Sequence, residues 1–219
     1  GERDGKQADS AIAMNGSLQN PELLVQLDNG DSHFAVNGKL RPFEPLLNRK
    51  IVNLNIDGRQ INPEWFDPSL PAADLVFNLA LNPAEEADTL AGLLEVRNQA
   101  PAPINGNGIP VAGINGKLKV DTSGKLHLDN VDTELAAGGR ITFNGNIDSA
   151  NQNMAVDAAV QQFKLQDILK QKLDLSLDGD IKLSGSLGSP QADWQLKAGQ
   201  TATSGTFQLL HPHERSSGN

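Results

Sequence analysis

The residues best suited to chemistry lie in NLNIDGRQINPE, residues 53–64, where oxygen-bearing side chains are spaced like the ligands of a calcium-binding loop. Asn stands where such loops begin with Asp, Pro63 occupies the eleventh position, and WFDPSLP after Glu64 is unsuited to an exit helix. A strand that ends in a turn at Gly58 explains the same residues. We therefore assign no metal ion, and keep a calcium-binding module as an alternative hypothesis, with candidate ligands Asn53, Asn55, Asp57 and Glu64.

Other groups of reactive residues do not form a recognisable site. NGNGIP, residues 105–110, lacks the third glycine of a dinucleotide-binding loop and follows no parallel-sheet strand. Two of the four histidines, His211 and His213, lie in a polar tail, and the others are His33 and His127. No serine, histidine and acid stand in the setting of a nucleophile elbow. We predict that the chain is not an enzyme, and we assign neither catalytic residues nor a cofactor.

Composition narrows the possible ligands further. The formal charge of −9 repels phosphate backbones, so we do not expect nucleic acid as a partner. Aromatic residues make up 4% of the chain and tyrosine is absent, so the apolar residues are aliphatic and unsuited to stacking bases or sugars. The lack of cysteine fits the bacterial periplasm, and it fits many cytosolic proteins as well.

Alternating apolar and polar residues dominate the sequence, as in LVFNLAL (75–81) and KLHLDN (125–130), and they predict half-buried strands. Short helices are expected at 43–50 and 164–172. Residues 82–98 carry both a helix capping box and strand alternation, and their propensity favours a helix. We expect an excised piece of a longer protein, with a continuous β-segment at 11–210 between flexible tails at 1–10 and 211–219.

One short unit recurs along the chain. It reads AIAMNGSL, HFAVNGKL, GINGKLKV, RITFNGNI and DIKLSGSL, and its glycines are Gly16, Gly38, Gly116, Gly145 and Gly185. A longer echo joins GSLQNPELLVQL (16–27) to GSLGSPQADWQL (185–196), which suggests two copies of one element. The spacing is irregular, so a solenoid of fixed period is not expected.

The Asn-Gly pairs in this unit would ordinarily predict tight hairpins. A two-residue turn at Asn37-Gly38 would place Val36 and Leu40 on opposite faces, whereas a continuous strand keeps them together. Burying a Leu or Ile contributes about 1.5–3 kcal/mol. Keeping the apolar residues of each unit on one face therefore outweighs the turn preference of Asn-Gly. We predict continuous strands. A glycine within an apolar strand face indicates either curvature over an ordinary core or a trough with room for a guest chain.

The order of segments over about residues 75–210 resembles the TamB family, the inner-membrane subunit of the translocation and assembly module, in the AsmA-like group. The similarity lies in GLLEVRNQAPAPINGNGIPVAGINGKLKV, KLHLDNVDTELAAGGRITFNGNI and LSLDGDIKLSGSLGSPQADWQLKAG. The resemblance implies a periplasmic protein with an inner-membrane anchor, a role in outer-membrane biogenesis and autotransporter assembly, and contact with the outer-membrane barrel TamA through a region absent here. It also implies a strand at residues 85–98.

The resemblance further implies an all-β fold, an elongated and strongly curled antiparallel sheet that forms an open apolar groove. Such a groove carries phospholipid or shields hydrophobic outer-membrane polypeptides. Aliphatic side chains suit acyl chains, which need no directional donor. A surface adhesin or passenger domain with a solid core is the alternative. The candidate lipid-binding residues are Ile12, Met14, Leu18, Phe34, Val36, Leu40, Ile114, Leu118, Val120, Ile141, Phe143, Ile147, Ile181, Leu183 and Leu187, with the five repeat glycines as groove glycines.

Overall fold

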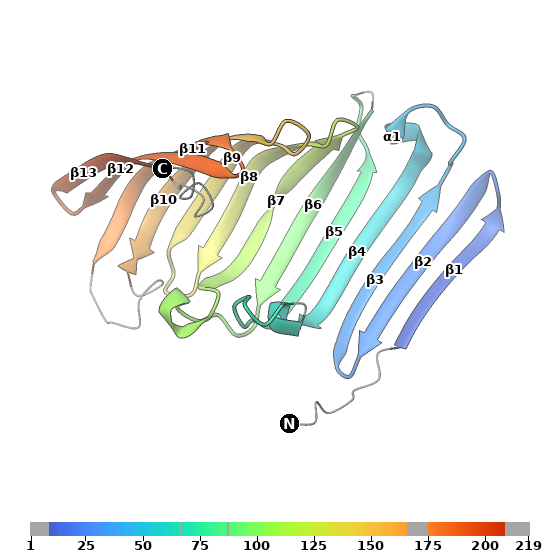
Figure 1. Ribbon diagram of the computed structural model, residues 1–219, viewed down its shortest axis with the longest axis horizontal. Helices are drawn as coiled ribbons and strands as arrows, with labels where there is room; N and C mark the ends of the chain where they lie inside the picture. The colour runs from blue at the N-terminus through green and yellow to red at the C-terminus, as the bar shows by residue number, and fades with distance from the viewer. Residues whose placement is uncertain (1–8, 66, 87, 166–174, 209–219) are drawn as a thin grey trace, which may run out of the picture.

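The computed structural model describes residues 9–65, 67–86, 88–165 and 175–208. In this part of the chain all the strands belong to one antiparallel sheet of thirteen strands, ordered β1 to β13 as they follow in sequence (Figure 1). The prediction of an all-β, antiparallel structure is confirmed. The strands are β1 (Asp9–Ser17), β2 (Asn20–Asn29), β3 (Ser32–Leu40), β4 (Ile51–Ile61), β5 (Leu75–Pro83), β6 (Thr89–Asn98), β7 (Val111–Asp121), β8 (Lys125–Leu135), β9 (Arg140–Asp148), β10 (Asn153–Lys164), β11 (Ser176–Ser186), β12 (Ser189–Ala198) and β13 (Thr201–Gln208).

Helices are short in the described residues. They are α1 (Leu47–Lys50) and the 3-10 turns η1 (Pro63–Trp65) and η2 (Ile104–Gly106). The helix favoured by propensity at 82–98 is wrong, because β6 pairs along its length with β5 and β7, and this pairing outweighs the capping signal. The strand that the family resemblance implies at residues 85–98 is correct from Thr89 to Asn98, and it does not extend to residues 85 and 86. Most of the helix expected at 164–172 lies outside the described residues.

No Asn-Gly or Ser-Gly pair of the five units is itself the turn, and three of the units run straight through as strands. Gly38, Gly116 and Gly145 each lie inside a ladder whose partners continue on both sides of the glycine. Gly16 and Gly185 lie one residue before the ends of β1 and β11. The prediction that the apolar phase outweighs the Asn-Gly turn preference is confirmed.

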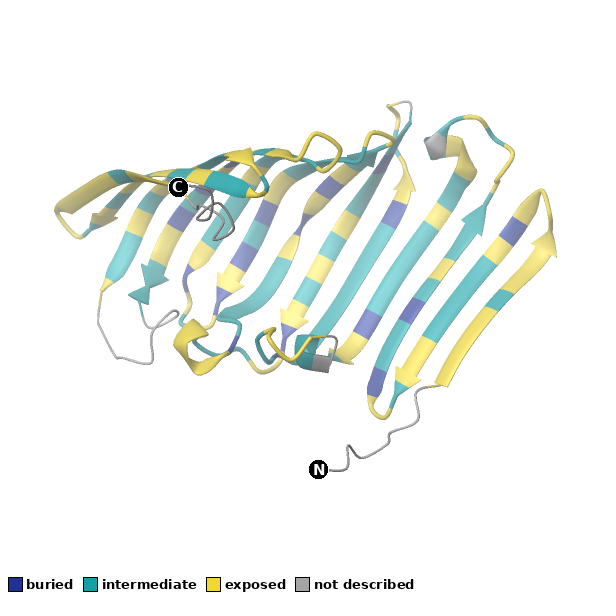
Figure 2. Ribbon diagram, viewed as in Figure 1, coloured by how far each residue is buried: buried dark blue, intermediate teal, exposed yellow. Residues whose placement is uncertain are grey.

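The pairing register separates the side chains of the sheet into two faces. Residues directly opposite each other share a face, and successive residues of a strand alternate between faces. Ile12 is opposite Val25, Val25 is opposite Val36, and the series continues through Ile56 to Leu79 and Leu94. We call this side the apolar face and the opposite side the polar face. Bands of different burial alternate along the strands in Figure 2, as this arrangement requires.

Three bulges preserve the apolar face where the sequence departs from strict alternation. β4, β8 and β10 each contain one extra residue relative to β5, β9 and β11, respectively, with which they pair. Each bulge includes one residue with positive φ, and these residues are Gln60, Asn130 and Gln162. Neighbouring carboxyl or amide oxygens satisfy two of the displaced backbone amides. Asn144 Oδ1 accepts from Asn130 N and Asp178 Oδ1 accepts from Gln162 N, each at 2.8 Å. The bulges therefore return the apolar side chains to one side.

The sheet twists across its width but is neither strongly curled nor closed, so the strong curl expected from the sequence is wrong. The described residues contain no second sheet and no helix longer than α1, so neither face has a second layer over it. The predicted tails, apart from Asp9 and Ser10 in β1, lie largely outside the described residues.

Candidate functional site: an uncovered apolar face

The structure brings the predicted lipid-binding residues together on the apolar face. Ile114 is linked through Thr133 and Ile141 to Val160, and Phe143 through Ala158 to Ile181. Alternation along the strands then places Met14, Phe34, Leu118, Val120, Ile147, Leu183 and Leu40 on the same side. Leu18 and Leu187 differ, because each lies in a hairpin turn after its strand has ended.

Large side chains from adjacent strands occupy the space beside several glycines of this face. The Phe77 ring lies where a Cβ on Gly58 would project, and the Phe34 and Phe77 rings come within 6.2 Å of each other, centroid to centroid. Side-chain atoms of Val131 likewise lie where a Cβ on Gly116 would project, and the Leu54 side chain lies beside the corresponding position on Gly38. These glycines therefore admit the side chains of the next strand. A guest molecule would lie on those side chains and not on the glycine backbone.

Sequence reasoning missed much of the apolar face, because it followed only the glycine-bearing units. Strands without that unit also contribute residues to the apolar face. The alternation of apolar and polar residues in these strands was the signal that could have found them. The missed residues include Leu23, Val25, Leu54, Ile56, Phe77, Leu79, Leu94, Val96, Leu128, Val131, Val156, Val160, Trp194 and Leu196.

Burial changes steadily across the apolar face. At its centre Leu118 is 8% exposed and Val156 is 5% exposed, and each is opposite a leucine on one adjoining strand and a glycine on the other. At the β1 edge Ile12 is 78% exposed and Met14 is 64% exposed, and at the β13 edge Phe207 is also exposed. Most of the remaining apolar side chains are half-buried. The face thus offers a packed centre and accessible aliphatic margins.

The polar face carries hydrogen-bonded ladders of short side chains. Asn78 Nδ2 donates to Asn55 Oδ1 at 3.1 Å, and Thr142 Oγ1 donates to Asp132 Oδ1 at 2.6 Å. Such cross-strand pairs each contribute about 0.2–1 kcal/mol to a sheet. This face is therefore well solvated and internally paired.

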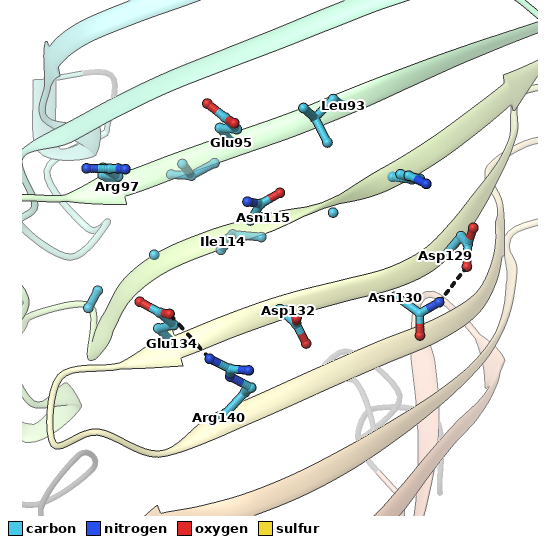
Figure 3. Close-up of a pocket in the computed structure, with 15 residues that line it drawn as sticks. Leu93, Glu95, Arg97, Ile114, Asn115, Asp129, Asn130, Asp132, Glu134 and Arg140 are labelled. Carbon is cyan, nitrogen blue, oxygen red and sulfur yellow. Dashed lines mark hydrogen bonds and ion pairs between the residues drawn. The ribbon is translucent and has the colours of Figure 1, made fainter.

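A hollow of about 790 Å³ lies on the polar face over β6 to β9 (Figure 3). Its acidic side chains stand beside basic ones, and Arg140 Nη2 lies 3.6 Å from Glu134 Oε1. Both partners are exposed, so the pair contributes little energy. No group of three or more potential metal ligands occurs within the described residues. The hollow has the character of a balanced, solvated surface.

The calcium-like segment does not form a loop. Asn53, Asn55 and Asp57 alternate along β4 and so line up on the polar face, whereas Gly58 belongs to the apolar face. Glu64 lies in η1, and its Oε1 accepts from Asn107 Nδ2 at 3.4 Å. An extended strand cannot wrap these oxygens around one ion. The calcium hypothesis therefore loses its geometric basis.

Two other segments weighed in the sequence have structural explanations. In NGNGIP, Gly108 packs against Ala102, and Asn98 Nδ2 donates to Ile109 O at 3.1 Å, so this loop is organised from within. His33 Nδ1 lies 2.7 Å from Asp28 Oδ1. His211 and His213 lie outside the described residues.

No family model, curated protein or solved structure matches the chain. Among the described helices, none has the length and apolar content needed to cross a membrane.

Proposed function

We propose that this chain is a segment of a periplasmic conduit, of the TamB type, whose apolar face carries phospholipid acyl chains between membranes in support of outer-membrane biogenesis. The observation that carries the proposal is a single aliphatic face across thirteen strands with no second layer over it in the described residues. Contact with the barrel TamA, and an anchor in the inner membrane, belong to the same proposal.

The dimensions of the face suit this ligand. Twelve steps between thirteen strands, at about 4.8 Å each, give a length of roughly 58 Å. This length exceeds the roughly 30 Å hydrocarbon thickness of a bilayer, so extended acyl chains fit along the face. Several molecules placed end to end would cover it.

The chemistry of the face also suits acyl chains. A hydrocarbon chain contributes about 0.8 kcal/mol for each methylene removed from water and requires no hydrogen-bond donor. Leu, Ile and Val supply most of the contact surface, and the charged residues of the strands lie on the opposite face. The headgroup would then remain in water at the open margin. In this proposal the shallow sheet becomes a groove when lipid, or neighbouring protein, supplies the facing side.

The alternative of an adhesin with a solid core is less well supported. A solid core requires a second layer over the apolar side chains. The described residues supply none, and their edge residues on the apolar face are exposed. If the face instead binds a hydrophobic outer-membrane polypeptide, adding that polypeptide should displace the bound lipid in the test.

Lipid transfer provides the test, with adjacent leucines as a matched pair. Leu93 and Leu94 lie on the polar and apolar faces of β6, respectively. The probe is zwitterionic phosphatidylcholine with a fluorescent acyl chain, offered from detergent micelles. Leu94→Asp should reduce the bound probe several-fold, and Leu93→Asp should leave it near the unmodified level.

A second variant guards against loss of folding in Leu94→Asp. Phe207 is 52% exposed on the apolar face of the edge strand β13, so Phe207→Asp should preserve the far-UV spectrum while weakening binding. Equal binding by all three variants, or no binding by the unmodified chain, would contradict the proposal.

A further inference from the structure

Two hairpins at different places in the sheet are copies of each other. In β1–β2, Gly16 is opposite Pro21, and in β11–β12, Gly185 is opposite Pro190. The two glycines have φ of +91° and +95°. In each turn a serine Oγ accepts a backbone N–H three residues on, at 3.3 Å for Ser17 and 3.0 Å for Ser186. The internal repeat is therefore a structural repeat.

The copies differ on their outer side. β11 pairs with β10, so that Ile181 is opposite Ala158 and Leu183 is opposite Val156, and Leu187 N donates to Gln152 O at 2.8 Å. The residues of the β1–β2 hairpin that correspond to Ile181, Leu183 and Leu187 are Ile12, Met14 and Leu18. Those three are 78%, 64% and 80% exposed, whereas their counterparts are half-buried.

The β1 edge also lacks the features that normally protect an edge strand. It carries no lysine and no proline, its one charged residue is Asp9 at the first position, and its pairing with β2 is regular from end to end. Natural edge strands usually carry lysine, proline or a bulge, which prevent pairing with another chain. An unprotected edge with exposed aliphatic side chains is suited to accept a strand.

We infer that the β1 edge binds one antiparallel strand of the β10 type, contributed in an extended polypeptide with alternating apolar residues. β10 shows the chemistry of the occupant, because it fills the corresponding place beside β11. Small and aliphatic side chains of the bound strand would lie against Ile12 and Met14 on the apolar face. A backbone carbonyl of the turn preceding that strand would accept from Leu18 N. This inference does not depend on lipid binding.

Disulfide capture tests the register. The chain has no cysteine, so Ala13→Cys introduces a single thiol at the position that corresponds to Lys182, which is opposite Asp157. The probe is a peptide of residues 152–160 in which the Asp157 position is cysteine, activated as a mixed disulfide with thionitrobenzoate. The protein thiolate attacks the peptide sulfur, the new disulfide forms, and thionitrobenzoate leaves and is measured by its colour.

The matched peptide places cysteine one residue later, at the Ala158 position, on the opposite face of the strand. The in-register peptide should react about tenfold faster, because pairing raises the effective concentration of the two sulfurs. Ile12→Lys added to Ala13→Cys should abolish this preference. Ser204→Cys on the β13 edge should react with both peptides at one background rate.

Three outcomes would overturn the inference. They are equal rates for the two peptides at Ala13→Cys, the same preference at Ser204→Cys, and a protein homodisulfide that forms faster than the peptide adduct. The last would identify a second copy of β1 as the occupant. A far-UV spectrum unchanged by Ala13→Cys confirms that the edge is intact during the measurement.

Discussion

The hairpins β1–β2 and β11–β12 have the same turn and pairing register, yet one lies at the edge of the sheet and the other is inside it. Their shared geometry follows from local sequence: a glycine with positive φ, a proline opposite it, and a serine that caps the turn. Their burial differs because only β11 has a neighbour on its outer side among the described strands. Local sequence therefore determines the hairpin, whereas its neighbours determine how strongly it is stabilised.

The largest expected difference between the copies concerns Ile181 and Ile12. Ile181 lies between Ala158 and Trp194, so Ile181→Asp removes a packed side chain and leaves a poorly solvated charge. We expect a loss of about 2–4 kcal/mol in the free energy of unfolding. Ile12→Asp changes an exposed side chain and should cost less than about 0.5 kcal/mol. Urea unfolding followed by circular dichroism measures both, and equal losses would contradict the comparison.

A smaller effect is expected at the two turn glycines. Gly16→Ala and Gly185→Ala both force a Cβ into a positive-φ conformation, which costs about 1 kcal/mol or more. A Cβ on Gly16 would also lie 2.9 Å from Asn20 O, whereas the nearest backbone atom to one on Gly185 is at 3.5 Å.

These glycine variants should separate local from global stability. Because β1 is an edge strand, Gly16→Ala should mainly increase hydrogen exchange at Asn20 and leave the global unfolding midpoint nearly unchanged. Gly185→Ala should lower that midpoint. A reversed order would show that β1 contributes to the cooperative unit as much as β11 does.

The smallest expected effect is a difference in pH dependence between turns capped by aspartate and turns capped by serine. Asp121 Oδ1 accepts from Ser123 Oγ and from Lys125 N, and Asp148 Oδ1 accepts from Asn151 N at 2.9 Å. Hydrogen bonds from the side chains of Ser123 and Asn151, respectively, lower the pKa of these carboxyls below the ordinary value for aspartate. A lowered folded-state pKa gives stability that is present above the unfolded pKa and is lost as pH falls through the folded one.

Acid should therefore loosen the turns at Asp121 and Asp148 and leave the serine-capped turns at Ser17 and Ser186 unchanged. Amide exchange at Ser123 and Asn151, compared with Asn20 and Ser189, measures this from pH 5 down to about pH 2, across the usual aspartate range. Asp148→Asn keeps an acceptor oxygen and should remove the pH dependence there. A serine-capped turn that loosens to the same degree would contradict the assignment.

Much of the fold could be predicted from the sequence, because the alternation of apolar residues continues unchanged on both sides of the Asn-Gly pairs. The phase around Gly38, Gly116 and Gly145 indicated continuous strands, and the two GSL segments indicated a repeat. The bulges were missed although a signal was present. Apolar residues three apart, such as Leu128 and Val131, enclose a polar pair and require an extra residue to stay on one face.

Other features could not be predicted, because they depend on contacts between strands. Propensity favoured a helix at 82–98, whereas the ladders on both sides of β6 make it a strand. The family resemblance implied a strongly curled sheet, whereas the sheet is not strongly curled. In β2, β5 and β12 the alternation indicates which residues share a side, but only the pairing register assigns that side to the apolar face.

The most direct test of the central claim compares photocrosslinking at Leu94 and Leu93. A benzophenone amino acid at either position is irradiated in the presence of the fluorescent phosphatidylcholine, and adducts are identified by mass spectrometry. Lipid adducts at Leu94, with few at the more accessible Leu93, are the predicted result, because only Leu94 lies on the apolar face. Equal labelling at both positions, or labelling at Leu93 alone, would contradict the account.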